Sequence, residues 1–127
     1  MRTLTANSLR MMERSMEFLW AKQAAHLDNI ANAETPGYKV KTVTFEESFD
    51  AALRSAQVQT RPRMFMRRAI EQVSWKVDDD DEVTRMDENG VNVLEQSLEA
   101  VRTAYQLQYT MQSISNDLAR INAAIKG

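Results

Sequence analysis

Residues 100–125 read AVRTAYQLQYTMQSISNDLARINAAI, and their apolar side chains recur at alternating steps of three and four. This spacing is the a/d pattern of a heptad repeat, and it predicts a long helix that packs along another helix. A helix of about 34 residues would be about 50 Å long, which is too long to lie inside a small globule. The row therefore requires an elongated partner, either another part of this chain or another copy. We call it the C-terminal seam; it comprises Ala100, Ala104, Leu107, Met111, Ile114, Leu118, Ile121 and Ile125.

The start and end of this helix are also marked in the sequence. Asn92 is predicted to cap its N-terminus, because Glu95 stands at the third position after it. Lys126 and Gly127 supply the cation and the glycine that typically end a helix. The first half carries a second apolar stripe beside the seam, which indicates more than one neighbour. This stripe comprises Leu94, Leu98, Val101 and Tyr105.

A second long helix is predicted over residues 4–33, a stretch without Gly or Pro. The helix must end before Pro36, because the residue before a proline is driven out of the α region. Asn32, Thr35 and Gly37 then favour a tight turn. The apolar side chains that keep to one side at helical steps are Leu9, Met12, Met16, Leu19 (or Trp20), Ala24, Leu27 and Ile30.

The middle of the chain begins with weaker patterns. Residues 38–41 are predicted to be extended. Thr44 and Glu47 have the spacing of a capping box, and apolar residues follow at helical steps. A short helix is therefore predicted over residues 45–55.

Further along the middle segment, the pattern changes to that of a strand. Val73, Trp75 and Val77 alternate with polar residues, as in a half-buried strand. The acidic residues 78–82 would form its loop, and residues 83–86 a returning strand. This hairpin, or an irregular segment in its place, would end at the turn signal at residues 89–90.

These patterns predict a mainly α fold. Long N- and C-terminal helices form an antiparallel coiled-coil-like pair, with a small irregular or β-hairpin middle segment. The chain divides into residues 1–37, 38–90 and 91–127, which together form one structural domain.

Opposite charges cluster in the middle segment. Arg61, Arg63, Arg67 and Arg68 surround residues 64–66, and the acidic run at 78–82 follows closely. The net charge of −2 does not favour nucleic-acid binding. Two readings of the charges stay open. The two patches either meet across a subunit contact, or they neutralise each other within one chain.

The sequence shows no constellation for catalysis or metal binding. There is no Cys, and the one histidine, His26, has no E-x-x-H around it. Residues 87–90 imitate part of a calcium loop, but Arg85 and Gln96 then occupy positions that need acidic ligands. Three glycines at 37, 90 and 127 cannot make a phosphate-binding loop. We therefore expect no enzyme, no cofactor and no small-molecule substrate.

Residues 27–39, LDNIANAETPGYK, form the most specific motif in the chain. This signature segment closely resembles the N-terminal signature of bacterial flagellar rod and hook proteins, in its proximal-rod version. The shared core is Asn29, Ile30, Ala31 and Asn32, followed by a turn and an aromatic residue. The resemblance extends to both ends of the chain and leaves the middle uncovered. Glu95-Gln96 departs from the Glu-Met that the family often has near this point.

The resemblance implies a structural protein of the flagellar basal body. Subunits would stack helically into a rod that spans the periplasm, through their terminal helices. Partners would be other copies of the chain, other rod proteins, the basal-body MS-ring and the adaptor FliE. Export would use the flagellar type III apparatus without a cleaved signal, and residues 2–10 indeed lack the apolar core of a signal peptide. A free-standing helical adaptor that grips a partner helix is the alternative.

Each part of the signature segment has a predicted physical role. Asn29 and Asn32 are expected to bond local backbone where the helix ends. Thr35, Pro36 and Gly37 fix the reversal, with Gly37 free to take a positive φ. Tyr38 is an anchor that is apolar in its body and polar at its tip. The terminal helices are further predicted to be largely unfolded before assembly and to order on docking.

Overall fold

The structure is a computed structural model that describes residues 2–45, 54, 62–72, 74–80 and 91–127. Its elements follow in the order α1 (Arg2–Ala31), β1 (Val40–Phe45), α3 (Pro62–Glu71), β2 (Trp75–Asp80) and α4 (Val93–Lys126). The described chain is mainly helical, with long helices near both ends and one small sheet. The predicted fold class is confirmed at this level.

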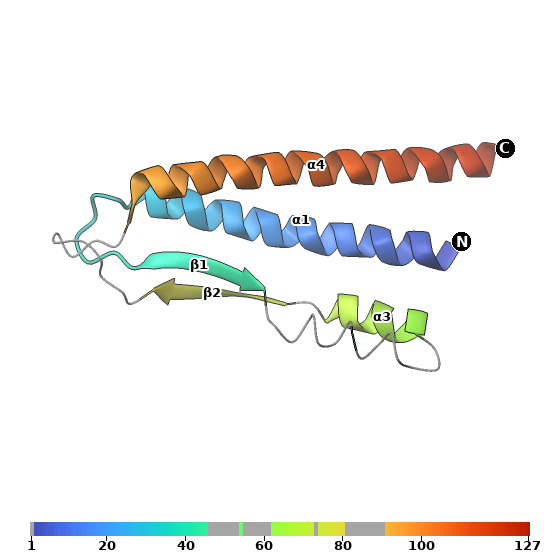
Figure 1. The fold of residues 1–127 in the computed structure, drawn as a ribbon, viewed down its shortest axis with the longest axis horizontal. Helices are drawn as coiled ribbons and strands as arrows, with labels where there is room; N and C mark the ends of the chain where they lie inside the picture. Colours follow the sequence, from blue (N-terminus) through green and yellow to red (C-terminus); the bar gives the residue numbers. More distant parts are fainter. Residues whose placement is uncertain (1, 46–53, 55–61, 73, 81–90) are drawn as a thin grey trace.

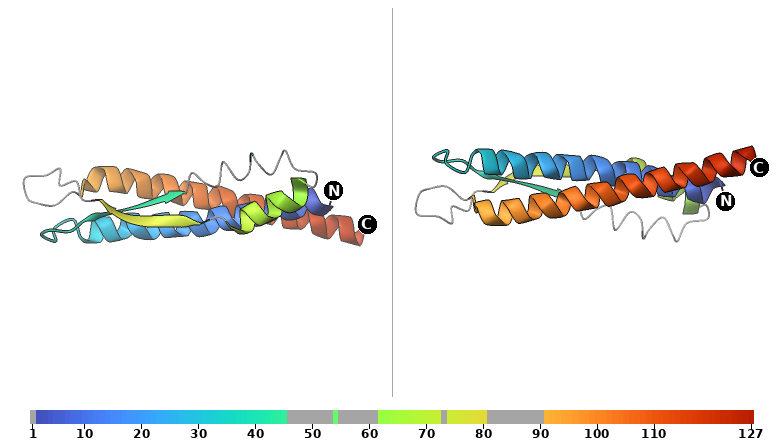
Figure 2. Two further views of the ribbon diagram at one scale, coloured as in Figure 1. Left: turned by 90° about the horizontal axis from the view of Figure 1, so that it is seen from below. Right: turned by 90° about the horizontal axis from the view of Figure 1, so that it is seen from above.

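The molecule is elongated and layered. α1 lies between α4 on one side and the sheet and α3 on the other (Figure 1). α1 begins and α4 ends at the same end of the molecule (Figure 1). Figure 2 shows from two further directions that the two long helices run side by side and cross at a shallow angle. α1 is thus the central element, and α4 has α1 as its main neighbour.

α1 presents the predicted face to its neighbours only in part. Leu19 is buried as predicted, and the other predicted residues that are half-buried are Leu9, Met12, Met16 and Ile30. Leu19, Ala25 and Asn29 are buried, whereas Trp20 and Leu27 are more than half exposed. Ala24, which was also assigned to the inner face, is exposed. The reason is that α1 is covered from two directions, by α4 and by the sheet with α3. A prediction from one apolar stripe places only apolar residues on the inner face. In the structure the inner face includes the polar Asn29, and Trp20 lies on the exposed side.

The sheet is a two-stranded antiparallel pair of β1 and β2. Val43 lies opposite Val77 in the register, and Thr42 lies opposite Asp78. Val43 is buried, because β1 packs on α1, whereas Val77 is half exposed. β2 is the outer strand, and its hydrogen bonds to β1 hold it in position (Figure 1).

Several predictions for the middle segment need correction. The strand predicted around Trp75 exists, but Asp78 belongs to the strand and not to a loop. Its partner is β1, and the predicted return strand at 83–86 lies outside the described residues. Thr44 and Phe45 close β1 instead of opening a helix. The rest of that predicted helix is outside the described residues apart from Arg54, which is helical.

α3 is an element that the sequence reading missed. Pro62 stands at its first position, where a proline costs no hydrogen bond. Ala69 and Ile70 are buried, and the Arg14 guanidinium of α1 donates to the Glu71 carbonyl at 3.1 Å. The last carbonyls of a helix attract such a cation. This contact ties the end of α3 to the middle of α1.

The charge of the basic cluster is partly neutralised by a residue of the same helix. Arg67 pairs with Glu71 one turn along α3, and Arg68 lies over the Phe65 ring at 5.9 Å. In the acidic run, Asp78 pairs with Lys76 of the same strand. Arg67 and Asp78 thus pair with opposite charges on their own elements, whereas Arg68 lies against an aromatic ring.

Candidate assembly site

Asn29 is the centre of the signature segment. Its side chain is fully buried. Its amide Nδ2 donates to the Lys41 carbonyl at 2.9 Å and to Gln96 Oε1 at 3.1 Å. Its Oδ1 accepts from the Lys41 backbone N–H at 2.9 Å and from the Tyr38 hydroxyl at 3.2 Å. An asparagine amide has two donor hydrogens and two acceptor lone pairs, so these bonds use its whole capacity.

The Asn29 side chain and the Lys41 backbone exchange two hydrogen bonds, as two paired residues do in an antiparallel β-ladder. These bonds fix the start of β1 against the last turn of α1, twelve residues away in sequence. The expected local backbone bond is made by Asn32 instead, whose Nδ2 donates to the Asp28 carbonyl at 2.9 Å. The Lys41 ammonium adds an ion pair with Asp28 at 3.1 Å. The two asparagines therefore have different tasks, a long-range one and a local one.

The turn after α1 has the pattern of a type II β-turn. The Tyr38 N–H donates to the Thr35 carbonyl at 3.3 Å. Pro36 and Gly37 occupy the two central positions, and Gly37 has φ +70°. A type II turn requires a positive φ at the third position, which glycine adopts without strain. Thr35 also donates its hydroxyl to Asn32 Oδ1 at 3.2 Å, which links the turn to the helix end.

Gln96 joins the signature segment to α4. Its Oε1 lies 2.7 Å from His26 Nδ1 and accepts from Asn29 at 3.1 Å. Both donors come from α1, so one carbonyl oxygen holds the end of α1 beside the start of α4. Glu95 N–H donates to Asn92 Oδ1 at 3.2 Å, which is the predicted N-cap bond. In the sequence, Gln96 stands out only as a departure from the family pattern and as a mismatch to a calcium loop, and neither observation predicts these hydrogen bonds.

The remaining signature residues differ in exposure. Ile30 is half-buried and Ala31 is exposed, while Ala33 is buried under the turn. Thr35, Pro36 and Gly37 are exposed, and Tyr38 is half-buried. The turn at residues 35–37 is thus exposed to solvent, whereas Asn29, which bonds Tyr38 directly after the turn, is buried.

The C-terminal seam is only partly covered by α1. Ala100 and Leu107 are buried, as is Thr103 between them, which the seam did not include. Two further seam residues, Ile114 and Ile121, are half-buried. The exposed members are Ala104, Met111, Leu118 and Ile125. The seam therefore has a covered half near the start of α4 and a more open half toward its end.

The second stripe on α4 is not beside the seam but on the opposite side of the helix. Leu98 and Leu107 are nine residues apart, which is about two and a half turns. Leu107 is buried, whereas every member of the stripe is exposed. Tyr109, four residues after Tyr105, extends the row and is also exposed. We call this row the outer stripe; it comprises Leu94, Leu98, Val101, Tyr105 and Tyr109.

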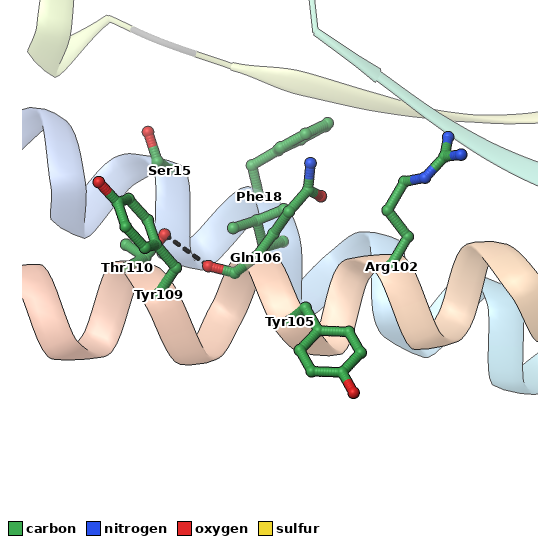
Figure 3. A pocket seen from close by; sticks show the side chains of 8 residues that line it. Ser15, Phe18, Arg102, Tyr105, Gln106, Tyr109 and Thr110 are labelled. Carbon is green, nitrogen blue, oxygen red and sulfur yellow. Dashed lines mark hydrogen bonds between the residues drawn. The ribbon is translucent and has the colours of Figure 1, made fainter.

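Two open hollows flank the contact between α1 and α4. Figure 3 shows one of them, where Phe18 of α1 lies behind Gln106 of α4 and the Tyr105 ring points away from α1. In the same view the Thr110 hydroxyl donates to the Gln106 carbonyl at 2.8 Å. The hollow on the other side is lined by Trp20, Gln23, Ala104, Leu107, Gln108, Met111, Gln112 and Ser115.

Charges around these surfaces are paired along each helix. Arg10 donates to Glu13 at 2.9 Å, and this hydrogen bond raises the pKa of the Arg10 guanidinium. Glu99 pairs with Arg102 at 3.0 Å on α4. Exposed pairs of this kind contribute little stability. Glu99 and Arg102 lie beside Leu98 and Val101 of the outer stripe, whereas Arg10 lies near Glu71 of α3.

Within the described part of the chain, no three His, Asp or Glu side chains are gathered closely enough to hold a metal ion. Among the same residues, no helix has the length and apolar character needed to cross a membrane. No model of a known protein family and no curated protein matches this chain. The features of this chain that bear on its function are therefore the signature segment, the seam and the outer stripe.

Proposed function

We propose that this chain is a structural subunit of the proximal rod of the bacterial flagellar basal body, similar to the rod protein FlgB. The observation that carries the proposal is the junction built by the signature segment. Asn29 bonds Lys41, Tyr38 and Gln96, so the motif that resembles the rod family is also the point where both terminal helices and the sheet meet. A helix-ending turn alone would need the proline and glycine but not a buried asparagine.

In this proposal α1 and α4 form an antiparallel coiled-coil-like pair. The Asn29–Gln96 bond supports it at one end, and the hollow shared by Phe18 and Gln106 supports it further along. Residue numbers thus fall along α1 as they rise along α4. The exposed part of the seam and the outer stripe supply apolar surface that a monomer rarely shows in such continuous rows.

The subunits assemble helically through these helices, as part of the drive shaft for motility. The partners in this proposal are other copies, other rod proteins, the MS-ring, FliE and the type III export apparatus. The place of action is the rod in the periplasm, after synthesis in the cytoplasm and export by the type III apparatus. No catalysis, cofactor, nucleic acid or small-molecule substrate belongs to this role.

The test is deletion and complementation in the bacterium that encodes the chain. Deletion should abolish swimming and leave basal bodies without a rod, and the intact chain should restore both. Asn29→Ala should restore neither, whereas Asn32→Ala, a matched change at an exposed bond, should restore swimming at least in part. A deletion strain that swims with complete flagella would reject the proposal.

The alternative is a free-standing helical adaptor. The hollow lined by Trp20 and Met111 favours it, because a partner helix fits a groove between two helices. Electron microscopy of the purified chain mixed with the other rod proteins separates the two functions. A rod subunit enters an open tube, whereas an adaptor forms a closed complex of fixed size.

Folding on assembly is a further part of the proposal. Circular dichroism of the dilute chain should show much less helix than the assembled form, as coupled folding and binding requires. Equal helical content in the dilute and assembled chains would reject folding on assembly, and the proposed role as a rod subunit would stand.

A further inference from the structure

Two exposed apolar surfaces lie on different sides of this molecule. The first is the outer stripe, whose five side chains are 55 to 76% exposed. The second is a groove between α1 and α4 on the side where Trp20 lies. We call it the Trp20 groove; its large apolar side chains, 50 to 57% exposed, are Trp20, Leu27, Met111 and Leu118.

The Trp20 groove runs along both helices. Trp20 and Met111 line the same hollow from α1 and α4. Leu27 and Leu118 each follow seven residues later, which is close to two full turns, so each lies on the same side of its own helix. Because the two helices run in opposite directions, Leu27 extends the α1 wall toward the start of α4, and Leu118 extends the α4 wall toward the other end of the molecule. Ala104, seven residues before Met111, adds a small and exposed position to the α4 wall.

We propose that the outer stripe of one copy docks in the Trp20 groove of the next copy. This inference rests on the proposed role as a rod subunit and specifies which two surfaces meet in the assembly. The occupant is a second copy because the two surfaces match in repeat and in length. In the stripe, Leu94 and Val101 are seven residues apart, as are Leu98 and Tyr105. Ala104, Met111 and Leu118 repeat every seven residues in the groove wall.

The lengths agree as well. The outer stripe spans residues 94–109, about 22 Å of helix, and the α4 wall of the groove spans residues 104–118, about 21 Å. A seven-residue repeat on both surfaces is what knobs-into-holes packing requires. A stripe of this length covers the whole α4 wall, and the half of that wall from Ala104 to Met111 also has the apolar residues of α1 beside it.

The pairing of unlike surfaces determines the kind of assembly. A contact between two different patches is heterologous, and it leaves one free stripe and one free groove at every stage of growth. Such a contact produces an open polymer unless the rotation closes a ring. A contact of stripe with stripe would be isologous and would stop at a dimer.

The size of the contact fits a polymer better than a stable dimer. Five partly exposed large side chains bury about 600 Å², below the roughly 800 Å² per partner of a standard interface. A single contact of this kind is weak. It becomes effective when each subunit makes several contacts at once, as in a tube.

The experiment uses the absence of cysteine from the chain. Val101→Cys marks the outer stripe, and Met111→Cys marks the groove. Ala124→Cys is the control, at an exposed position of α4 that lies beyond both surfaces. Each full-length variant is assembled with the other rod proteins and treated with a short bismaleimide cross-linker. The expected result is a cross-linked dimer from an equal mixture of Val101→Cys and Met111→Cys, and none from either variant alone or from mixtures with the control.

A second measurement does not depend on the cross-linker's reach. Leu98→Gln should raise the critical concentration for assembly by about tenfold or more, which corresponds to at least about 1.4 kcal/mol. Ala124→Gln, at an exposed position beyond both surfaces, should leave the critical concentration unchanged. Leu98 is exposed, so the helical content of the unassembled variant should equal that of the wild type.

The outcomes separate this inference from the proposed function. If wild-type chain assembles and Val101→Cys cross-links to itself, or if Leu98→Gln assembles like wild type, the stripe-in-groove contact is wrong while the rod role stands. If the wild-type chain does not assemble with rod proteins, the proposed function fails and the inference fails with it.

Discussion

Replacing Asn29 with alanine tests how much the buried junction contributes to the fold. The change removes the two bonds to the Lys41 backbone, the bond from the Tyr38 hydroxyl and the bond to Gln96. A hydrogen bond contributes about 0.5–1.5 kcal/mol net, and losing buried partners costs more. Water reaches half-buried Lys41 and Tyr38 and offsets part of the loss. We therefore expect Asn29→Ala to lower the free energy of unfolding by about 2–4 kcal/mol.

Urea unfolding followed by circular dichroism at 222 nm measures this difference, in a buffer that contains a stabilising osmolyte to keep the dilute chain folded. Asn32→Ala is the matched control, because Asn32 bonds the local Asp28 carbonyl and Thr35 near the surface. Its expected cost is below about 1 kcal/mol, as for an ordinary exposed hydrogen bond. Equal losses for the two variants, or a loss below 1 kcal/mol for Asn29→Ala, would refute the assignment of Asn29 as the organising residue.

A double-mutant cycle then isolates the bond between the helices. Gln96→Ala removes the oxygen that accepts from both Asn29 and His26. Residues in one hydrogen-bond network are not additive, and their coupling is typically about 0.5–3 kcal/mol. Asn29→Ala and Gln96→Ala should therefore cost less together than the sum of the two single changes. Strict additivity would mean that the Asn29–Gln96 bond contributes nothing to the pairing of α1 with α4.

Three other substitutions test local features of the structure by the same urea measurement. Gly37→Val should lower the free energy of unfolding by about 1–2 kcal/mol. Backbone strain is the whole cause, because no atom lies within 4 Å of an added Cβ. The change should also impair swimming and rod assembly, whereas Gly37→Asn should have little effect, because asparagine tolerates a positive φ. Thr103→Val should be neutral or stabilise by up to about 1 kcal/mol, since the Thr103 hydroxyl is buried and has no hydrogen-bond partner; a clear loss of stability would contradict this. Leu107→Ala should cost about 2–4 kcal/mol because Leu107 is buried, while Leu98→Ala at an exposed position of the same helix should cost less than about 0.5 kcal/mol; similar costs would mean that the two faces of α4 are misassigned.

The long terminal helices were predictable from sequence because periodicity and boundary signals agreed. For α4, the seam, the Asn92 cap and Gly127 predict nearly the observed bounds of Val93–Lys126. For α1, Pro36 places the end correctly to within a few residues of Ala31. These signals are local and need no knowledge of the partner elements.

The faces of the helices were less predictable than their existence. A stripe of apolar residues predicts which side seeks cover, but it does not say how many neighbours are present. The stripe predicts Leu27 on the inner face, with Leu19 or Trp20 beside it. In the structure Leu19 and the polar Asn29 are buried, whereas Trp20 and Leu27 are more than half exposed. The outer stripe was placed beside the seam, and only the geometry of nine residues between Leu98 and Leu107 shows that it faces away.

The middle segment was predicted worst, because its contacts are distant in sequence. β1 pairs with β2, which lies some thirty residues further on, while the prediction favoured a hairpin with the nearest strand-like stretch. The sequence prediction does not include α3, because residues 61–68 were interpreted by their arginine charges. Pro62 was not recognised as the first residue of a helix. Gln96 was missed for a similar reason, since its partners His26 and Asn29 are about seventy residues away.

The distribution of buried side chains connects the fold to assembly. Among the described residues, the largest side chains that are fully buried are Val91, Asn29 and Thr103, and two of these three are polar. The apolar material that would fill a larger core instead stands on the open sides of α1 and α4, at positions such as Trp20 and Tyr109. A chain with a thin core has little stability of its own, because apolar burial is the main favourable term in folding. Binding to the folded form shifts the folding equilibrium by mass action. Covering the outer stripe and the Trp20 groove in an assembly would therefore stabilise the subunit and the polymer by the same contacts.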